Sequence, residues 1–181
     1  AYIVGGGETI ADLDYTSATA LTAGTSIQDA ALNNASLTLF TPGTAGSLSN
    51  NKNITIDTTA PTISFVDSST PNATYAAGTI SIQVVFSEAV VVALAAPQLA
   101  LNSGGTANYV SGSGTAVLNF DYIIAPGQLA SDLDYVAAGS FNLNGATVRD
   151  LALNNANTLL ASPGAPSSLG FNEAIGIDSQ A

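Results

Sequence analysis

The stretch TISIQVVF, residues 79–86, decides the fold class of this chain. Ile80, Ile82, Val84 and Phe86 occupy every second position in it. Successive residues of a strand point to opposite faces of a sheet, so this alternation is typical of a half-buried strand. The stretch therefore predicts a β-strand that turns these four side chains toward a hydrophobic core.

Similar short runs, bounded by Gly, Pro, Asn and Ser, predict further strands on both sides of this stretch. They are residues 61–66, 88–94, 97–102, 106–111, 115–124, 141–150 and 175–178. Within 141–150, Asn144-Gly145 is a strong signal for a two-residue hairpin turn. Apolar residues make up 46% of the 181 residues, enough for a packed core. Short strands with turns every 8–12 residues or so predict an all-β fold, an immunoglobulin-like β-sandwich.

The sequence contains an internal repeat. Asp14 corresponds to Asp134, a separation of 120 residues. After a slip of one residue, SIQDAALNNAS (26–36) corresponds to TVRDLALNNAN (147–157), a separation of 121. This period is too long for a solenoid repeat and suits a whole β-sandwich domain of roughly 100 residues.

The repeat predicts the domain organisation. Residues 61–181 form one complete immunoglobulin-like repeat, residues 1–57 form the C-terminal half of another, and residues 58–61 form the linker. A half repeat by itself would expose the apolar edges of its strands. We expect the chain either to be a window of a long tandem array, as the missing initiator Met also indicates, or to complete its half repeat with strands from another copy.

Several motifs, in their order and spacing, resemble one known family. They are FSEAVVV (86–92), PQLALNSGG (97–105), NYVSGSGTAVLNFDY (108–122), SDLDY (131–135), RDLALNNA (149–156) and the IDTTAP joint (56–61). Together they are similar to the bacterial immunoglobulin-like repeats of giant secreted or surface-attached proteins, of the adhesin or extracellular-matrix type. The resemblance covers essentially the whole chain. It implies an extracellular location at the cell surface and a tandem array that serves as a spacer, fibre or adhesin stalk, often stiffened by calcium.

Composition excludes several classes of function. Thirteen acidic residues face only two basic ones, Lys52 and Arg149, for a net charge of −11. Without a basic patch, binding to nucleic acid or to an anionic membrane is excluded. The longest apolar run, residues 89–97, is too short to span a bilayer. Because the chain has no His, Cys or Trp, a His-based triad, a thiol nucleophile, a zinc site and a Trp platform for sugars are excluded, and we expect no enzyme.

The motif DLDY occurs twice and suggests a cation site. In a strand, Asp12 and Asp14 would lie side by side, as would Asp132 and Asp134, with Cα atoms about 6–7 Å apart. Two carboxylates this close repel each other, and a calcium ion, which takes six to eight oxygen ligands, would relieve the repulsion. The alternative is a solvated face on which water and salt screen the two charges.

A second recurring motif, D-x-x-L-N-N, begins at Asp29 and at Asp150. Asp and Asn bind nearby backbone N–H groups, so the motif predicts a turn or helix cap. The alternative is a calcium ligand, and one carboxylate can serve both purposes.

Acidic residues also gather around the linker. Asp57 and its equivalent Asp178 end the two copies of the last strand, and Glu88 and Asp67 lie in or beside strands that follow the linker. A calcium ion bound by Asp57 together with Glu88 or Asp67 would stiffen the connection between repeats.

One further carboxylate, Asp121, shares a strand face with Val117 and Ile123 and is expected to be partly buried. A buried carboxylate needs a partner, for which the sequence offers Arg149, a hydroxyl group or a metal ion. For Arg149 we expect a structural ion pair.

These interpretations predict a structural repeat unit of an extracellular bacterial fibre, matrix or adhesin stalk, with Ca²⁺ as a structural cofactor. Its partners would be neighbouring repeats or copies of itself, with self-assembly by strand complementation through the half repeat. The alternative is a carbohydrate- or ice-binding adhesin module, with a surface glycan as the partner of the parent protein. Against it, Tyr75, Tyr109 and Tyr122 are scattered, and the Thr residues follow no short repeat.

Overall fold

In the computed structural model, which describes residues 1–180, nearly all regular structure is β, as the sequence predicts. The chain divides into two compact units, Ala1–Thr59 (unit 1) and Ala60–Ala181 (unit 2), and the predicted linker spans this division. Unit 1 contains β1 (Thr9–Ile10), α1 (Leu48–Asn51) and β2 (Ile56–Asp57).

Unit 2 holds the other strands and one four-residue helix. Its elements are β3 (Ile63–Ser68), β4 (Thr74–Tyr75), β5 (Thr79–Ala93), β6 (Gln98–Ala100), β7 (Thr106–Ser111), β8 (Thr115–Ile123), β9 (Leu129–Ala130), β10 (Phe141–Asn142), β11 (Thr147–Arg149), α2 (Leu169–Asn172) and β12 (Gly176–Asp178).

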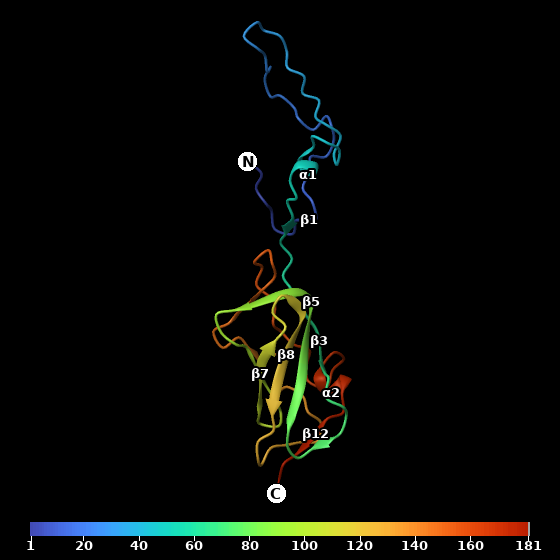
Figure 1. Cartoon of the computed structure of the whole chain (residues 1–181), viewed down its shortest axis with the longest axis vertical. Coiled ribbons are helices and arrows are strands. Elements are labelled where there is room, and N and C mark those ends of the chain that lie inside the picture. Colours follow the sequence, from blue (N-terminus) through green and yellow to red (C-terminus); the bar gives the residue numbers. More distant parts are fainter. Residues whose placement is uncertain (181) are drawn as a thin grey trace. The chain divides into compact units, whose positions relative to one another are not determined.

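The longest strand, β5, organises unit 2 (Figure 1). Its first part pairs with β8 and with β3, and its last part pairs with β11. Ile80, Ile82, Val84 and Phe86 are all buried, so the predicted inward face is confirmed. The alternation in this one stretch therefore places one wall of the hydrophobic core.

The sequence predicts two strands where β5 is one, and this prediction is wrong. The pairing of β5 with β8 shifts register between Val85 and Val90, which interrupts the ladder without ending the strand. At this point the Ser87 N–H donates to the Thr62 carbonyl at 2.8 Å. Such irregularities bend a strand and increase its twist, so a single strand can serve two regions of the sheet.

The predicted hairpin at 141–150 is also wrong in its pairing. Asn144 and Gly145 do form a tight turn, with φ of 50° and 84°. However, β10 pairs with β6 and β11 pairs with β5, and these strands lie at opposite ends of the order β10-β6-β7-β8-β5-β11. Because only a short turn connects β10 to β11, the sheet has to curl until its two ends meet.

The core of unit 2 fills this curl. The ring of Phe141 on β10 packs edge-on against Phe86 and Phe120, with centroid distances of 6.2 and 5.7 Å. A smaller sheet, β4-β12-β9, supplies further buried side chains, among them Ile177, and α2 supplies Leu169. The architecture is consistent with an all-β sandwich.

Local contacts of unit 1 recur in the second half of unit 2. The correspondences follow separations of 120 or 121 residues, as in the sequence repeat. The β1–β2 pairing of unit 1 corresponds to the β9–β12 pairing of unit 2, and the helix N-cap Ser47 corresponds to Ser168. The hydrogen bond from Leu13 N to Ile54 O corresponds to that from Leu133 N to Ile175 O. The bond from Leu39 N to Ala18 O corresponds to that from Leu160 N to Ala138 O.

Burial differs greatly between the two units. In unit 1 only Ser47 and Ile56 are buried, whereas unit 2 has an extensive apolar core. Leu133, for example, is fully buried in unit 2, while its counterpart Leu13 remains half-exposed. Corresponding side chains therefore contribute much less to packing in unit 1 than in unit 2, although the local backbone contacts are the same.

A pair of matched substitutions tests this difference. Leu133→Ala removes a fully buried side chain and is expected to lower the free energy of unfolding of unit 2 by about 2–5 kcal/mol. Leu13→Ala, at the equivalent half-exposed position, is expected to cost unit 1 less than about 1 kcal/mol. Amide hydrogen exchange, which reports on each unit separately, measures both, and equal losses would contradict the difference in packing.

Candidate functional site

The second aspartate of DLDY is held by backbone hydrogen bonds in unit 2. Asp134 is only 5% exposed, and its two carboxylate oxygens accept from Tyr135 N at 2.8 Å and from Gly164 N at 2.9 Å. Its backbone also bonds with Asn102, which donates to the Asp134 carbonyl at 2.8 Å. Asp134 therefore ties together three segments that are distant in sequence.

Asp14 makes the corresponding contacts in unit 1. It accepts from Tyr15 N at 2.9 Å and from Gly43 N at 3.0 Å, and the Ser49 hydroxyl donates to it at 2.6 Å. Burial by itself would raise the pKa of Asp14, but the hydrogen bonds from Ser49, Gly43 and Tyr15 outweigh it and hold the pKa well below its usual range. The second aspartate of each motif thus acts as an acceptor for backbone N–H groups.

The first aspartate of each motif is less constrained. Asp12 is exposed, and Ile54 N donates to it at 3.4 Å. In unit 2, burial and then the charge of Asp134 raise the pKa of Asp132. A Cβ atom at Gly170 would lie 3.1 Å from Asp134 Oδ2 and 3.3 Å from Asp132 Oδ2, so these two oxygens are at most 6.4 Å (3.1 + 3.3) apart. The expected repulsion within the pair is present, but one member already satisfies two N–H donors.

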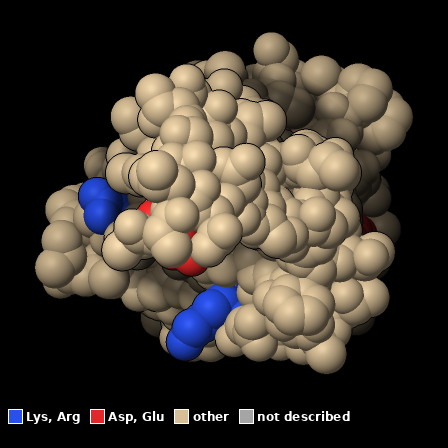
Figure 2. Space-filling view, turned by 90° about the horizontal axis from the view of Figure 1, so that it is seen from above, with Lys and Arg blue, Asp and Glu red and all other residues tan. Residues whose placement is uncertain are grey.

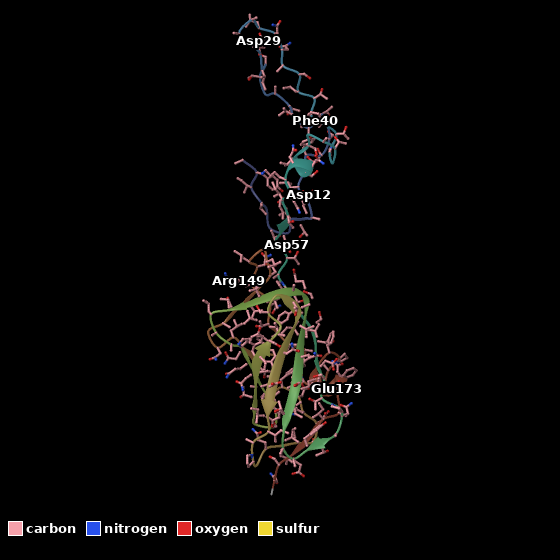
Figure 3. The ribbon with its side chains drawn as sticks, viewed as in Figure 1. Asp12, Asp29, Phe40, Asp57, Arg149 and Glu173 are labelled. Carbon is pink, nitrogen blue, oxygen red and sulfur yellow. The ribbon has the colours of Figure 1, made fainter. Side chains whose placement is uncertain are left out.

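The D-x-x-L-N-N motif forms a closed turn in both units, as one of its two interpretations predicts. Asp150 is 3% exposed and accepts from Asn154 N at 2.9 Å and from Asn154 Nδ2 at 2.8 Å. Asp29 accepts from the same groups of Asn33, both at 2.9 Å. Leu153 in this turn has a φ of 71°, in the left-handed region. In Figure 3, Asp29 lies at the tip of a loop of unit 1, far from Asp12.

Glu88 brings a second carboxylate close to Asp150 within unit 2. Oxygen atoms of the two side chains lie within 4.8 Å of each other. The reason is the pairing of β5 with β11, since Arg149, which precedes Asp150, lies opposite Val91. This acidic pair, Glu88 and Asp150, combines residues 62 positions apart (150 − 88) in the sequence.

The acidic pair lies where the chain enters unit 2. Ser87, next to Glu88, accepts through its hydroxyl from Thr62 N at 3.0 Å, and Asn157 N donates to the Pro61 carbonyl at 2.7 Å. Asp57 precedes Pro61 by four residues, which span at most roughly 14 Å of extended chain. Within unit 2, Glu88 and Asp150 are therefore the two carboxylates that could share a cation beside the entry of the chain.

The remaining linker acids have other surroundings. Asp57 Oδ1 accepts from Thr59 N at 2.9 Å, and its equivalent Asp178 accepts from Gln180 N at 3.4 Å. Asp67, named with Glu88 as a possible partner of Asp57, lies away from Glu88 on the sheet. Asp67 lies opposite Gln83, five residues before Glu88 on β5, which corresponds to roughly 15 Å along a strand.

Asp67 instead forms a pair with Glu173, a residue that the sequence did not single out. The hydrogen bond to Asp67, together with burial and the charge of Asp67, raises the pKa of Glu173, whereas bonds from Asn72 and Ser68 lower it. Glu173 directly follows α2 and lies 106 residues (173 − 67) from its partner in sequence. In Figure 3 it lies beside α2, well away from Arg149. Only the tertiary fold brings these two carboxyl groups together.

The partner of Asp121 is one of the three that the sequence offered, a hydroxyl group: Ser81 Oγ donates to Asp121 at 3.0 Å. Arg149 Nε donates to Asn155 Oδ1 at 2.8 Å. The face shown in Figure 2 is formed mostly by uncharged residues, with few acidic atoms among them. The negative charge of the chain therefore does not form a continuous patch on that face.

Comparisons with known proteins identify no relative: no family model matches the chain, and no curated protein or solved structure is significantly similar to it. Within residues 1–180, no helix is long and apolar enough to cross a membrane.

The two aspartates of DLDY are expected to differ when each is neutralised. Asp134→Asn replaces an acceptor of two N–H groups by a side chain with one acceptor, and should destabilise unit 2 by about 1–3 kcal/mol. Asp132→Asn removes a repelling charge and should leave stability unchanged or slightly higher. Urea unfolding in calcium and in excess chelator measures both, and an effect of Asp134→Asn that disappears in chelator would show that its role is metal binding.

The Asp67–Glu173 pair predicts a pH dependence. Because the folded-state pKa of Glu173 is raised, the folded protein binds its proton more tightly than the unfolded chain does. This contribution to stability is fully present below the ordinary pKa of 4.5 and is lost as the pH rises through the raised value. Glu173→Gln should flatten that decline and make unit 2 more stable at pH 7.

Urea unfolding of the two proteins between pH 4 and pH 7 measures this effect. Carboxylates with lowered pKa values, such as Asp14 and Asp29, lose their stabilising effect below their ordinary value of 3.8, so they act in a separate pH window. A Glu173→Gln variant whose profile parallels that of the unchanged protein would contradict the pairing.

Proposed function

We propose that this chain is a structural repeat unit of an extracellular bacterial fibre, matrix or adhesin stalk, in which β-sandwich units follow one another and calcium stabilises each connection. The observation that carries the proposal is the recurrence of the same hydrogen bonds at separations of 120 and 121 residues, for example those made by Tyr15 Oη to Phe40 O and by Tyr135 Oη to Ala161 O. Recurrence of tertiary contacts supports a repeated module more strongly than sequence similarity alone. A chain of such modules supplies length and stiffness, and the proposal assigns it no catalytic step.

The acidic pair supports calcium as the stabilising ion. Carboxylate oxygens of Glu88 and Asp150 lie within 4.8 Å of each other in unit 2, beside the residues through which the chain enters that unit. Oxygen-only ligands favour a hard cation, and calcium accepts six to eight of them in flexible geometry. The chain has no His or Cys that would favour a softer metal.

Repetition extends this proposal along an array. Asp178 stands at the end of unit 2 as Asp57 stands at the end of unit 1, and both terminate a short strand that pairs with an equivalent partner. In a tandem array every complete unit would carry one acidic pair beside the segment through which the chain enters it. Calcium bound there would stabilise each unit at the point where it follows the one before.

The carbohydrate-binding alternative gains no support from the tyrosines. Tyr122 is fully buried, and its hydroxyl donates to Gln128 Oε1 at 2.7 Å. Tyr109 packs edge-on against Phe120 at 5.8 Å, and the Tyr75 hydroxyl donates to the Pro71 carbonyl at 2.8 Å. These rings serve packing and local hydrogen bonding, so they offer no common platform for a sugar.

Calcium titration of the full chain tests the proposal. Extracellular calcium modules bind with dissociation constants of about 0.1–1 mM, for which 10 mM calcium should stabilise unit 2 by about 1.4–2.7 kcal/mol relative to excess chelator. Small-angle scattering should show a narrower distribution of particle dimensions with calcium. Unchanged stability and unchanged scattering in excess chelator would contradict a calcium-stabilised array.

Two variants locate the site. Glu88→Gln is expected to abolish the calcium effect, because it removes one of the two carboxylates without altering the turn that Asp150 holds. Glu8→Gln removes the same charge in unit 1, where Glu8 accepts from Tyr2 Oη at 2.7 Å, and should retain the calcium effect. Loss of the effect in both variants would indicate general charge screening instead of a site.

A further inference from the structure

Unit 1 leaves exposed a set of large apolar side chains whose counterparts in unit 2 are buried. In each of five pairs of corresponding residues, the unit 1 side chain is more exposed than its unit 2 counterpart. The exposed fractions are 55% for Tyr2 against 0% for Tyr122, 47% for Leu21 against 5% for Phe141, 51% for Ile27 against 3% for Val148, 36% for Leu48 against 0% for Leu169, and 39% for Ile54 against 0% for Ile175. The five counterparts belong to one core cluster of unit 2. Large apolar side chains left exposed at the equivalent positions mark a place where another segment binds.

Unit 2 shows what covers this surface, because its second half has the same local contacts as unit 1. Val148 lies on β11, which pairs with β5, and Phe141 packs against Phe86 and Phe120. The backbone before α2 is bonded to β3, where Val66 N donates to the Ser167 carbonyl at 3.0 Å. The cover is therefore the strand-rich segment 60–120, which contains β3 to β7 and the first part of β8.

The number of covering segments decides between the occupants of unit 1. Each chain carries one segment of this pattern, residues 60–120, and that segment already covers the second half of its own unit 2. A second copy of the chain could cover unit 1 with its own segment 60–120 only by uncovering residues such as Leu133 and Ile177, which are fully buried. Exchange between copies moves the exposed surface from one unit to another without removing it.

We infer that the apolar surface of unit 1 is the docking site for a further segment with the alternation of residues 60–120, which would cover unit 1 as residues 60–120 cover the second half of unit 2. The inference rests on the proposed repeat function and adds the identity of the partner. It replaces the exchange of strands between copies of this chain with the docking of a further segment of that pattern. Unit 1 then becomes the second half of a sandwich with the same core as unit 2.

A fusion tests this directly. A second copy of residues 60–120 is placed before Ala1 of the full chain, because Ala1 corresponds to Asp121 at the separation of 120. The backbone amides of Leu13 and Leu39 donate to Ile54 O and Ala18 O. Their hydrogen exchange should slow by about 100-fold in the fusion, because local structure that opens easily becomes part of a core. Binding of a dye that detects exposed apolar surface should fall at the same time.

Two neighbouring substitutions, made only in the added copy, provide matched controls. Ala107→Asp places a charge at a fully buried position of β7 and should abolish the protection of unit 1. Thr106→Asp adds the same charge at the adjacent exposed position and should retain it. Protection that survives both changes would overturn the inference, because it would not depend on the docked face.

Two further outcomes would also overturn it. The amides of unit 1 could exchange as fast in the fusion as in the chain alone while unit 2 remains folded. The chain alone could also form a dimer with protected unit 1 amides, which would identify a second copy as the occupant. The calcium response of Glu88 and Asp150 is measured in unit 2, so failure of docking and failure of the calcium-stabilised array are separate results.

Discussion

The closure of one sheet around β5 is the constraint on which unit 2 depends. β5 pairs with β3, β8 and β11, and the bend near Ser87 allows one strand to reach all three. The Asn144-Gly145 turn then joins β10 to β11 across the two ends of the strand order. Curling brings the two end strands toward each other and encloses the aromatic core.

Several carboxylates of unit 2 have a structural role inside the fold. The chain has almost no basic side chains, so the acids bind backbone N–H groups instead: Asp134 and Asp150 each accept from two donors, and both are nearly fully buried. Hydrogen bonds to an ionised acceptor are stronger than those between neutral groups. Acidic residues that resemble metal ligands in the sequence therefore first accept hydrogen bonds that hold loops in place. Only the carboxylates that strand pairing brings together remain as candidates for binding a cation.

The two units show how much one half of the fold depends on the other. Unit 1 keeps the backbone hydrogen bonds, the helix cap and the two-stranded sheet of its counterpart, yet it buries only Ser47 and Ile56. Backbone bonds by themselves contribute little net stability in water, because the unfolded chain bonds to water equally well. The proposed completion of unit 1 would convert this local structure into a core by adding apolar contacts without changing its path.

The fold class, the inward face of β5 and the turn at the D-x-x-L-N-N motif could be predicted from the sequence, because they depend on alternation and on contacts within a few residues. The break predicted at Ser87 and the hairpin predicted at Asn144-Gly145 were wrong, because a local signal specifies a bend or turn but not the partner of the flanking strands.

Which acidic side chains lie close to one another depends on the three-dimensional fold and could not be predicted from the sequence. Glu88 approaches Asp150 across a strand pair, Asp67 approaches Glu173 across 106 residues (173 − 67), and the members of DLDY differ because the loop at Gly164 reaches one of them. Charge and spacing predicted that the acids need partners. The choice of partner depended on the register and closure of the sheet, which bring distant segments within a few ångströms and are not encoded in any single stretch.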